Sequence, residues 1–133
     1  MLMVVDVQNG FVVPSSRPVV MVVVDLVQRW LALGAPVVLT RYRNHPGSPF
    51  VRLVDWHGMH TSPDIDLVAE LAPFAAEPGV YVVDKTTSTG LTDDVRRVIA
   101  TERVEHLYIC GIATDACVFA TALDASTVAW FPV

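Results

Sequence analysis

The chain has 133 residues, enough to bury one core, and 53% of them are hydrophobic. Its 14 acidic and 9 basic side chains give a formal net charge of −5, and the lack of a basic stripe argues against nucleic acid or an anionic membrane as partners. Two cysteines do not make a disulfide framework, and no basic secretory start precedes the first apolar run. We therefore expect a single domain, residues 1–133, in the cytoplasm.

The first 42 residues predict a strand, a helix and a second strand. Met1–Val5 is a β-rich run that ends at Asp6. Pro18–Leu33 has helical length and spacing and stops at Gly34, a good C-terminal cap. Pro36–Tyr42 is the next apolar run, and we expect it to form a strand.

The segment Arg43–Pro63 is rich in His, Pro, Gly and aromatic residues and predicts a long functional loop. The elements predicted after it are, in chain order, a short helix over Asp64–Phe74, a strand over Val80–Val83, a helix over Thr92–Arg103, a strand over His106–Cys110 and a helix over Cys117–Ala125. Apolar strands that alternate with helices indicate a parallel sheet covered on both faces, in a Rossmann-like three-layer α/β fold.

Polar side chains follow three of these strands. Asp6 ends the first, Lys85 follows the third, and the turn Gly111–Cys117 follows the fourth. In parallel sheets the chemistry gathers outside the carboxyl ends of the strands. We therefore expect Asp6, Lys85 and Cys117 to converge there.

Cys117 is the candidate nucleophile. A free cysteine has a pKa of about 8.5, and we expect a lower pKa here because Lys85 and a helix N-terminus would both favour the thiolate. Asp6 is placed to take the thiol proton and return it to a leaving group. Backbone N–H groups of the preceding turn could hold an oxyanion. Together these parts suit acyl transfer from an amide.

Three blocks resemble the isochorismatase-like, or nicotinamidase-related, cysteine hydrolases, and they follow in the family's order. They are VVDVQNGF (Val4–Phe11), VVDKTTSTGL (Val82–Leu91) and CGIATDACVFATALDA (Cys110–Ala125). The resemblance implies the isochorismatase-like fold, with Asp6 as proton shuttle, Lys85 as charge-stabilising partner and Cys117 as nucleophile. It also implies a cis peptide between Ile112 and Ala113 and an oxyanion hole formed by the amides of Ala113 and Cys117.

The same resemblance implies that Gln8 and Phe11 line the substrate pocket near the nucleophile. Phe50 and Trp56, in the long loop, either wall that pocket or simply cover the sheet. Three loop arginines either bind a carboxylate of the substrate or are solvated: Arg41, Arg43 and Arg52.

The metal site of the nicotinamidases is one departure from the family pattern. Tyr42 and Asn44 stand where the resemblance would require an Asp-x-His pair of ligands. Asp55, His57 and His60 lie nearby, but neither their spacing nor their loop matches the family's ligands. We expect no metal and no other cofactor, and nicotinamide becomes a doubtful substrate because the metal positions its ring.

Cys110 alternates within a strand and predicts a core side chain. Asp115 is expected to cap the helix that follows it, and Asp84 to be structural. Family members usually continue past the nucleophile helix, whereas this chain ends with STVAWFPV (Ser126–Val133), a residual strand, an interface arm or the mark of a truncation. A C-terminally shortened fold would expose a sheet edge and an apolar helix face, so we expect a homo-oligomer.

These observations predict a cysteine hydrolase that cleaves a small amide, ureide or carbamoyl C–N bond through a thioester. Hydrolysis of a vinyl ether, as in isochorismatase, is an alternative on the same fold, although those relatives work without the cysteine. A shortened, inactive homologue that acts as a binding or assembly partner is the alternative from another class.

Overall fold

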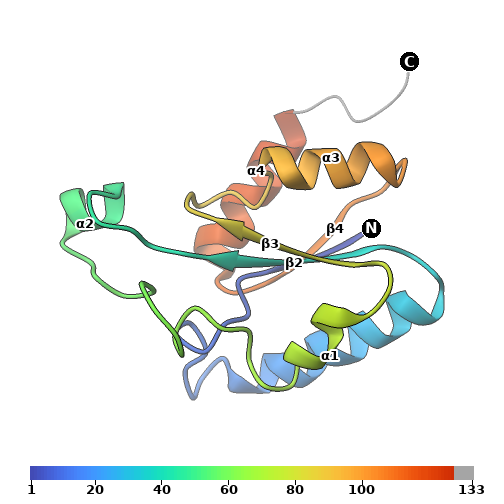
Figure 1. Cartoon of the computed structure of the whole chain (residues 1–133), viewed down its shortest axis with the longest axis horizontal. Helices are drawn as coiled ribbons and strands as arrows, with labels where there is room; N and C mark the ends of the chain where they lie inside the picture. The colour runs from blue at the N-terminus through green and yellow to red at the C-terminus, as the bar shows by residue number, and fades with distance from the viewer. Residues whose placement is uncertain (128–133) are drawn as a thin grey trace.

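The protein is described by a computed structural model over residues 1–127. Its four strands form one parallel sheet in the order β3-β2-β1-β4 (Figure 1). The elements are β1 (Leu2–Val5), α1 (Arg17–Ala32), β2 (Val37–Tyr42), α2 (Pro49–Val54), the 3₁₀ helix η1 (Ala72–Ala76), β3 (Val80–Lys85), α3 (Asp93–Thr101), β4 (Tyr108–Gly111), the π-helical turn η2 (Thr114–Val118) and α4 (Phe119–Thr127). The predicted parallel sheet and three-layer α/β fold are confirmed.

The sheet is covered on both faces, with α1 on one side and α3 and α4 on the other (Figure 1). Side chains that alternate along β1 point to opposite faces: Leu2 and Val4 pack with α1, whereas Met3 and Val5 pack with α3. All four are at most 2% exposed. Burial on both faces explains why the strands are apolar at nearly every position.

The strand register brings the polar residues to one edge of the sheet. β1 lies between β2 and β4, and Val5 pairs with both Thr40 and Gly111. Asp6 is the next residue along β1, and the backbone N–H of Asp6 donates to the carbonyl of Thr40 at 3.3 Å. On the far side of β2, Tyr42 pairs with Lys85. The carboxyl ends of the four strands therefore form the expected convergence.

Gly111 allows the chain to leave β4 close to β1. Its φ is +131°, and a Cβ atom at this position would lie 2.1 Å from the carbonyl oxygen of Val5. Only glycine fits, because the backbone of β1 occupies the space that a side chain would need. The turn that carries Cys117 starts from this close approach.

Two predicted helices differ from the structure. The expected helix over Asp64–Phe74 is wrong: these residues form turns, Leu67 makes an antiparallel bridge to Gln8, and η1 begins only at Ala72. The backbone of Leu67 pairs with another segment, and Pro73 has no N–H to donate to a longer helix.

The other differing helix is the one that carries Cys117. It was predicted from Cys117 to Ala125, but η2 comes first and α4 starts at Phe119. The thiol therefore lies in a π-helical turn and not at the first residue of an α-helix.

The long segment before η1 holds a helix, α2, that the loop prediction missed. Its signal is local: Ser48 accepts a hydrogen bond from the N–H of Val51, and Pro49 occupies the first helical position. Within residues 1–127, no helix combines the length and apolar character needed to cross a membrane. The expectation of a strand or arm in the tail falls mainly on residues 128–133, outside the described part of the chain.

Candidate active site

Asp6 and Lys85 form a fully buried ion pair at the carboxyl edge of the sheet. The Lys85 Nζ lies 2.7 Å from Oδ2 of Asp6, and both side chains are 0% exposed. Lys85 is the only lysine in the sequence. Burying two charges is expensive unless they are paired and hydrogen-bonded, so a pair kept here points to a function of the site.

The ammonium of Lys85 has further partners from its own loop. It donates to the carbonyl oxygens of Thr87 at 2.9 Å and Ser88 at 3.0 Å. These two carbonyls accept two of the three N–H groups of the ammonium, which also forms the ion pair with Asp6. The loop after β3 therefore fixes the position of the Lys85 ammonium.

Asp6 adopts a left-handed backbone conformation, with a φ of +53°. This conformation costs a non-glycine residue of the order of 1–3 kcal/mol and persists only where the surroundings hold it. Thr40 supplies that restraint, because its hydroxyl donates to Oδ1 at 2.8 Å. Oδ2 has no hydrogen-bond donor among the described residues beyond its charge contact with Lys85. Oδ2 is thus the oxygen available for a proton.

The thiol of Cys117 lies close enough to interact with both members of the pair. Its pKa is raised to about 11, mainly by burial and secondly by the charge of the Asp6 carboxylate, while Lys85 opposes the shift. The expectation of a depressed pKa is therefore wrong, since the cost of burying a thiolate and the repulsion from Asp6 outweigh the attraction of Lys85. At neutral pH Cys117 is therefore a thiol, and a thiolate would form only by transfer of its proton to a base.

The turn around Cys117 has the predicted cis peptide between Ile112 and Ala113, which the structure confirms. The carbonyl of Ala113 accepts from the N–H groups of Ala116 and Val118, and this closes η2. Asp115 is exposed inside the turn, and the capping position belongs to Ala113. The expected helix cap at Asp115 is therefore wrong.

An aromatic pocket of about 300 Å³ opens above the thiol. Tyr42 contacts the rings of Phe11, Phe50 and Trp56, with centroids 5.6–6.2 Å apart. The complete lining is Phe11, Tyr42, Phe50, Val54, Trp56, Ser88, Ala116 and Cys117. Phe50 and Trp56, whose role the sequence left open, belong to the pocket wall.

Tyr42 and Thr40 were not predicted as site residues. The Tyr42 ring lies 5.2 Å from Nζ of Lys85, a cation–π distance, and is 1% exposed. Burial raises the pKa of Tyr42, with further contributions from Cys117 and Asp6. The sequence signal that could have identified Thr40 and Tyr42 is their position at the end of β2, the strand next to β1.

Gln8 differs from its expected place. Its amide donates to the carbonyls of Tyr42 and Ile65 and accepts from the N–H of Tyr42 at 2.7 Å. It is 0% exposed and is absent from the pocket lining. Gln8 thus acts outside the pocket: it connects the backbone of Tyr42, a lining residue, to the backbone of Ile65.

The three arginines near the site do not line the pocket. Arg41 and Arg43 lie 2.7 and 3.0 Å from the two carboxylate oxygens of Asp84. Asp84 is therefore structural, as expected, and Arg52 is exposed on α2. No cationic side chain belongs to the pocket lining given above.

The residues that would have to hold a metal have other partners. Asn44 donates to the carbonyls of Trp56 and Gly58 and accepts from Ser48, so it organises the loop. His57 contacts Asp55 at 2.8 Å and stacks against His60 at 6.4 Å between centroids. Within residues 1–127, no group of three His, Cys, Asp or Glu side chains is arranged to bind a metal. Tyr42 and Asn44 therefore do not supply the Asp-x-His pair of metal ligands that the resemblance would require.

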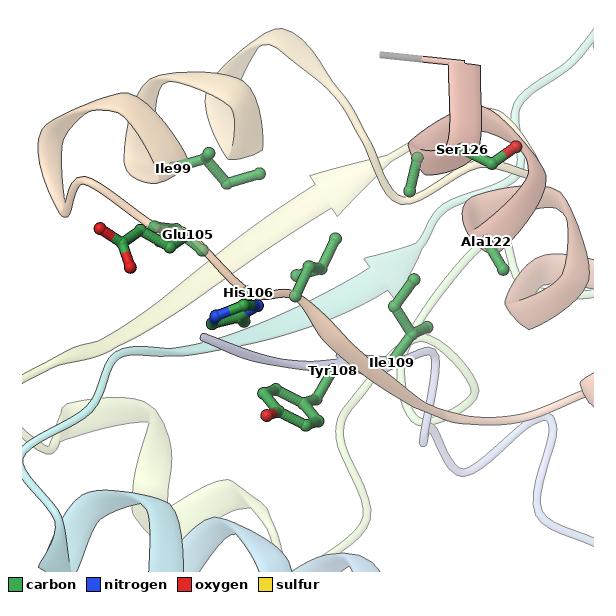
Figure 2. A pocket seen from close by; sticks show the side chains of 10 residues that line it. Ile99, Glu105, His106, Tyr108, Ile109, Ala122 and Ser126 are labelled. Atoms are coloured by element: carbon green, nitrogen blue, oxygen red, sulfur yellow. The ribbon is translucent and has the colours of Figure 1, made fainter. Parts of the chain in front are cut away.

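A second hollow, of about 540 Å³, lies between α3, α4 and the outer side of β4 (Figure 2). Ile99, Ile109 and Ala122 line it, and it shares no residue with the aromatic pocket. Tyr108 and Leu123 nearby are more than half exposed. In the described sheet β4 is an edge strand, so self-association at this side stays a prediction.

Comparison with known proteins supplies relatives for this arrangement. A Bacillus subtilis (strain 168) protein, described as an uncharacterized isochorismatase family protein named PncA, is 27% identical over 140 residues, covering 93% of this chain and 76% of that protein. Streptothricin hydrolase of Streptomyces noursei is 35% identical over 130 residues, covering 93% of this chain and 47% of the enzyme. The chain thus spans about half of the length of streptothricin hydrolase.

Solved structures share the fold. N-carbamoylsarcosine amidase from Thermoplasma acidophilum has a TM-score of 0.83 at 25% identity, over 93% of this chain and 73% of that one. Pyrazinamidase of Pyrococcus horikoshii, in complex with zinc, has a TM-score of 0.79 at 26% identity, over 94% and 76%. The family model of the isochorismatase domain matches residues 1–127. With the parallel sheet and the buried acid–lysine pair at its edge, this match means that the chain belongs to the isochorismatase family.

Proposed function

We propose that the protein is a cysteine-dependent hydrolase of small, uncharged amides. The observation that carries the proposal is the thiol of Cys117, a residue that lines the aromatic pocket within interaction range of the buried Asp6–Lys85 pair. Nucleophile, base and cation are the parts that acyl transfer from an amide needs. Relatives named as amidases and hydrolases support the same class of chemistry.

The first half-reaction forms a thioester. Asp6 accepts the proton of the Cys117 thiol as the sulfur attacks the amide carbonyl, and an S–C bond forms while the carbonyl oxygen becomes an oxyanion. The backbone amides of Ala113 and Cys117 are the donors proposed for that oxyanion. Asp6 then gives its proton to the departing amine or ammonia as the C–N bond breaks.

Water completes the cycle. Asp6, again a carboxylate, takes a proton from a water molecule that attacks the thioester, and the proton returns to the sulfur as the acid leaves. Lys85 keeps the carboxylate and the transient thiolate in a cationic environment throughout. The raised pKa of Cys117 suits this order of events, because the resting thiol loses its proton only when an acceptor carbonyl is in place.

The lining of the pocket favours an uncharged acyl group. Four aromatic rings and Val54 line the cavity, and the two arginines that contact Asp84 are not part of the lining. A substrate carboxylate would lose its hydration there without gaining a cation, which is costly. Flat or branched apolar groups next to the amide fit this lining better than carboxylate-bearing ureides.

A paired substrate screen tests the proposal. Ammonia release is measured for benzamide and isobutyramide and, as the charged comparison, for N-carbamoylglycine. We expect turnover of the neutral amides and at least about tenfold lower kcat/KM for the charged ureide, since rejecting one uncompensated charge is worth more than 1.4 kcal/mol. The reverse preference would overturn the substrate class.

Mass spectrometry of the quenched reaction tests the mechanism separately. An acyl adduct on Cys117 is expected with any amide that turns over, because the proposed route passes through a thioester. Turnover without an adduct in rapid-quench samples would favour direct attack by water on the amide, with no covalent intermediate. Neither turnover nor an adduct with any probe would favour the inactive homologue.

A further inference from the structure

Thr121 links the turn of the nucleophile to the loop that holds Lys85. It lies one helical turn after Cys117, on α4, and is a fully buried polar residue at 0% exposure. Its hydroxyl donates to the carbonyl oxygen of Cys117 at 2.6 Å. The same hydroxyl accepts the backbone N–H of Gly90 at 2.8 Å.

The first of these bonds is ordinary, and the second is not. Threonine in a helix commonly donates to the carbonyl four residues earlier, within one segment. Accepting the N–H of Gly90 ties that helix to a segment 31 residues away in sequence. One hydroxyl thus uses its donor and an acceptor site to connect two parts of the chain.

The connected segment is the one that positions the ammonium. Lys85 donates to the carbonyls of Thr87 and Ser88, and Gly90 follows two residues later. A Cβ on Gly90 would lie 3.3 Å from Oγ1 of Thr121 and 3.4 Å from Cγ2 of Thr40. Because Thr40 also holds Asp6, Gly90 is packed between the residues that hold the acid and the nucleophile.

A second bond set fastens the same two segments further along. Thr89 donates to Asp124 at 2.8 Å, and Arg96 contacts that carboxylate at 3.2 Å. Those groups are partly exposed, and they hold the loop to α4 one turn beyond Thr121. Removing the Thr121 hydroxyl would therefore leave the loop and helix attached while releasing the contact next to the sulfur.

We propose that Thr121 is a positioning residue that holds the sulfur of Cys117 in register with Asp6 and Lys85. The role rests on the proposed cysteine mechanism, since positioning matters for turnover only if the sulfur reacts. It acts through the carbonyl of Cys117 on one side and the N–H of Gly90 on the other, and it has no contact with substrate to make.

Thr121→Val tests the role because it keeps the β-branched shape and removes the hydroxyl. The variant is made in a Cys110→Ala background, so that iodoacetamide reports on Cys117 alone. We expect kcat to fall roughly 10- to 100-fold with little change in KM, as a small misplacement of reacting atoms does. Alkylation at pH 8 should become faster, since a sulfur released from burial and from Asp6 moves toward the ordinary thiol pKa.

Two matched variants make the test specific. Thr121→Ser keeps the hydroxyl and should restore both kcat and the pH profile of alkylation. Thr127→Val removes a hydroxyl bond of the ordinary kind on the same helix, from Thr127 to the carbonyl of Asp124, and should change neither. If the valine variant does not fold, Thr121→Ala removes the same hydroxyl without β-branching in the helix and gives the same readouts.

An alkylation profile of Thr121→Val equal to that of the parent would overturn the positioning role, and so would failure of Thr121→Ser to restore the parent profile. Alkylation needs no substrate, so these results stand whether or not an amide is turned over. If neither the parent nor any variant turns over an amide, but Thr121→Val still speeds alkylation of Cys117, the hydrolase mechanism is contradicted and the positioning role stands.

Discussion

The two cysteines of this chain differ in their neighbours and not in their acidity. Burial raises the pKa of Cys110 and of Cys117 to about 11. Cys110 packs on the α1 side of the sheet, where burial alone sets its pKa. Cys117 packs on the α3 side, with the charges of Asp6 and Lys85 acting on it. The pKa alone therefore does not distinguish the two thiols, and it is the neighbouring Asp6–Lys85 pair that singles out Cys117 as the proposed nucleophile.

Replacing each cysteine by alanine should give the largest contrast. Cys117→Ala removes the nucleophile, and kcat/KM should fall by at least about 10⁴-fold, the scale seen when an enzyme loses its nucleophile. Cys110→Ala removes a core sulfur and should leave kcat/KM within a few-fold of the parent. Ammonia release from the best neutral amide measures both. Retained hydrolysis in Cys117→Ala, with the fold intact by circular dichroism, would end the case for a cysteine mechanism.

Asp6→Asn should move turnover and alkylation in opposite directions. Turnover should fall about 10²- to 10⁴-fold because the amide cannot accept the thiol proton. The Asp6 carboxylate raises the pKa of Cys117, so its loss lowers that pKa, increases the thiolate fraction at pH 8 and speeds iodoacetamide alkylation. In the same sample, alkylation of Cys110 serves as the internal control and should not change. Slower alkylation of Cys117 would contradict the arrangement of charges described here.

Lys85→Met should slow the alkylation of Cys117, whereas Asp6→Asn speeds it, and the change should be smaller than in Asp6→Asn. The ammonium lowers the pKa of Cys117, so its loss raises the pKa further and slows alkylation at pH 8. Removing one partner of a buried ion pair should also cost about 3–5 kcal/mol of unfolding free energy, measured by urea denaturation.

The double variant Asp6→Asn/Lys85→Met separates the two effects of Lys85. It carries no unpaired buried charge, so it should recover part of the stability lost in Lys85→Met. A stability loss in the double variant equal to the sum of the losses in Asp6→Asn and Lys85→Met would mean that the pair is not coupled. An unchanged alkylation profile in Lys85→Met would remove Lys85 from the environment of the sulfur.

The sequence predicted the sheet and the meeting of Asp6, Lys85 and Cys117 because both depend on regular features. Apolar strands alternate with helices, and parallel strands bring their carboxyl ends together whatever the connections are. The segment between β2 and η1 has no such periodicity, so α2 was missed and a helix over Asp64–Phe74 was wrongly expected. Its structure depends on pairs far apart in sequence, such as Gln8 with Leu67.

The sign of the Cys117 pKa shift could not be read from residue types. Sequence motifs indicated a cation, an acid and a helix start, but the balance depends on how deeply the sulfur is buried and on where α4 begins. Thr40 and Tyr42 were overlooked for a related reason. Both act through contacts across neighbouring strands, and one sequence does not reveal which side chain faces a given charge.

The groups proposed to react and part of the pocket wall come from different regions of this molecule. The groups proposed to react stand on strand ends and on the turn after β4, whereas Phe50, Val54 and Trp56 come from α2 and the residue pair that follows it. Figure 1 shows α2 projecting from the sheet on long connections. Exchanging α2 and its flanking residues would therefore change part of the pocket wall for a different substrate while leaving Asp6, Lys85 and Cys117 in place.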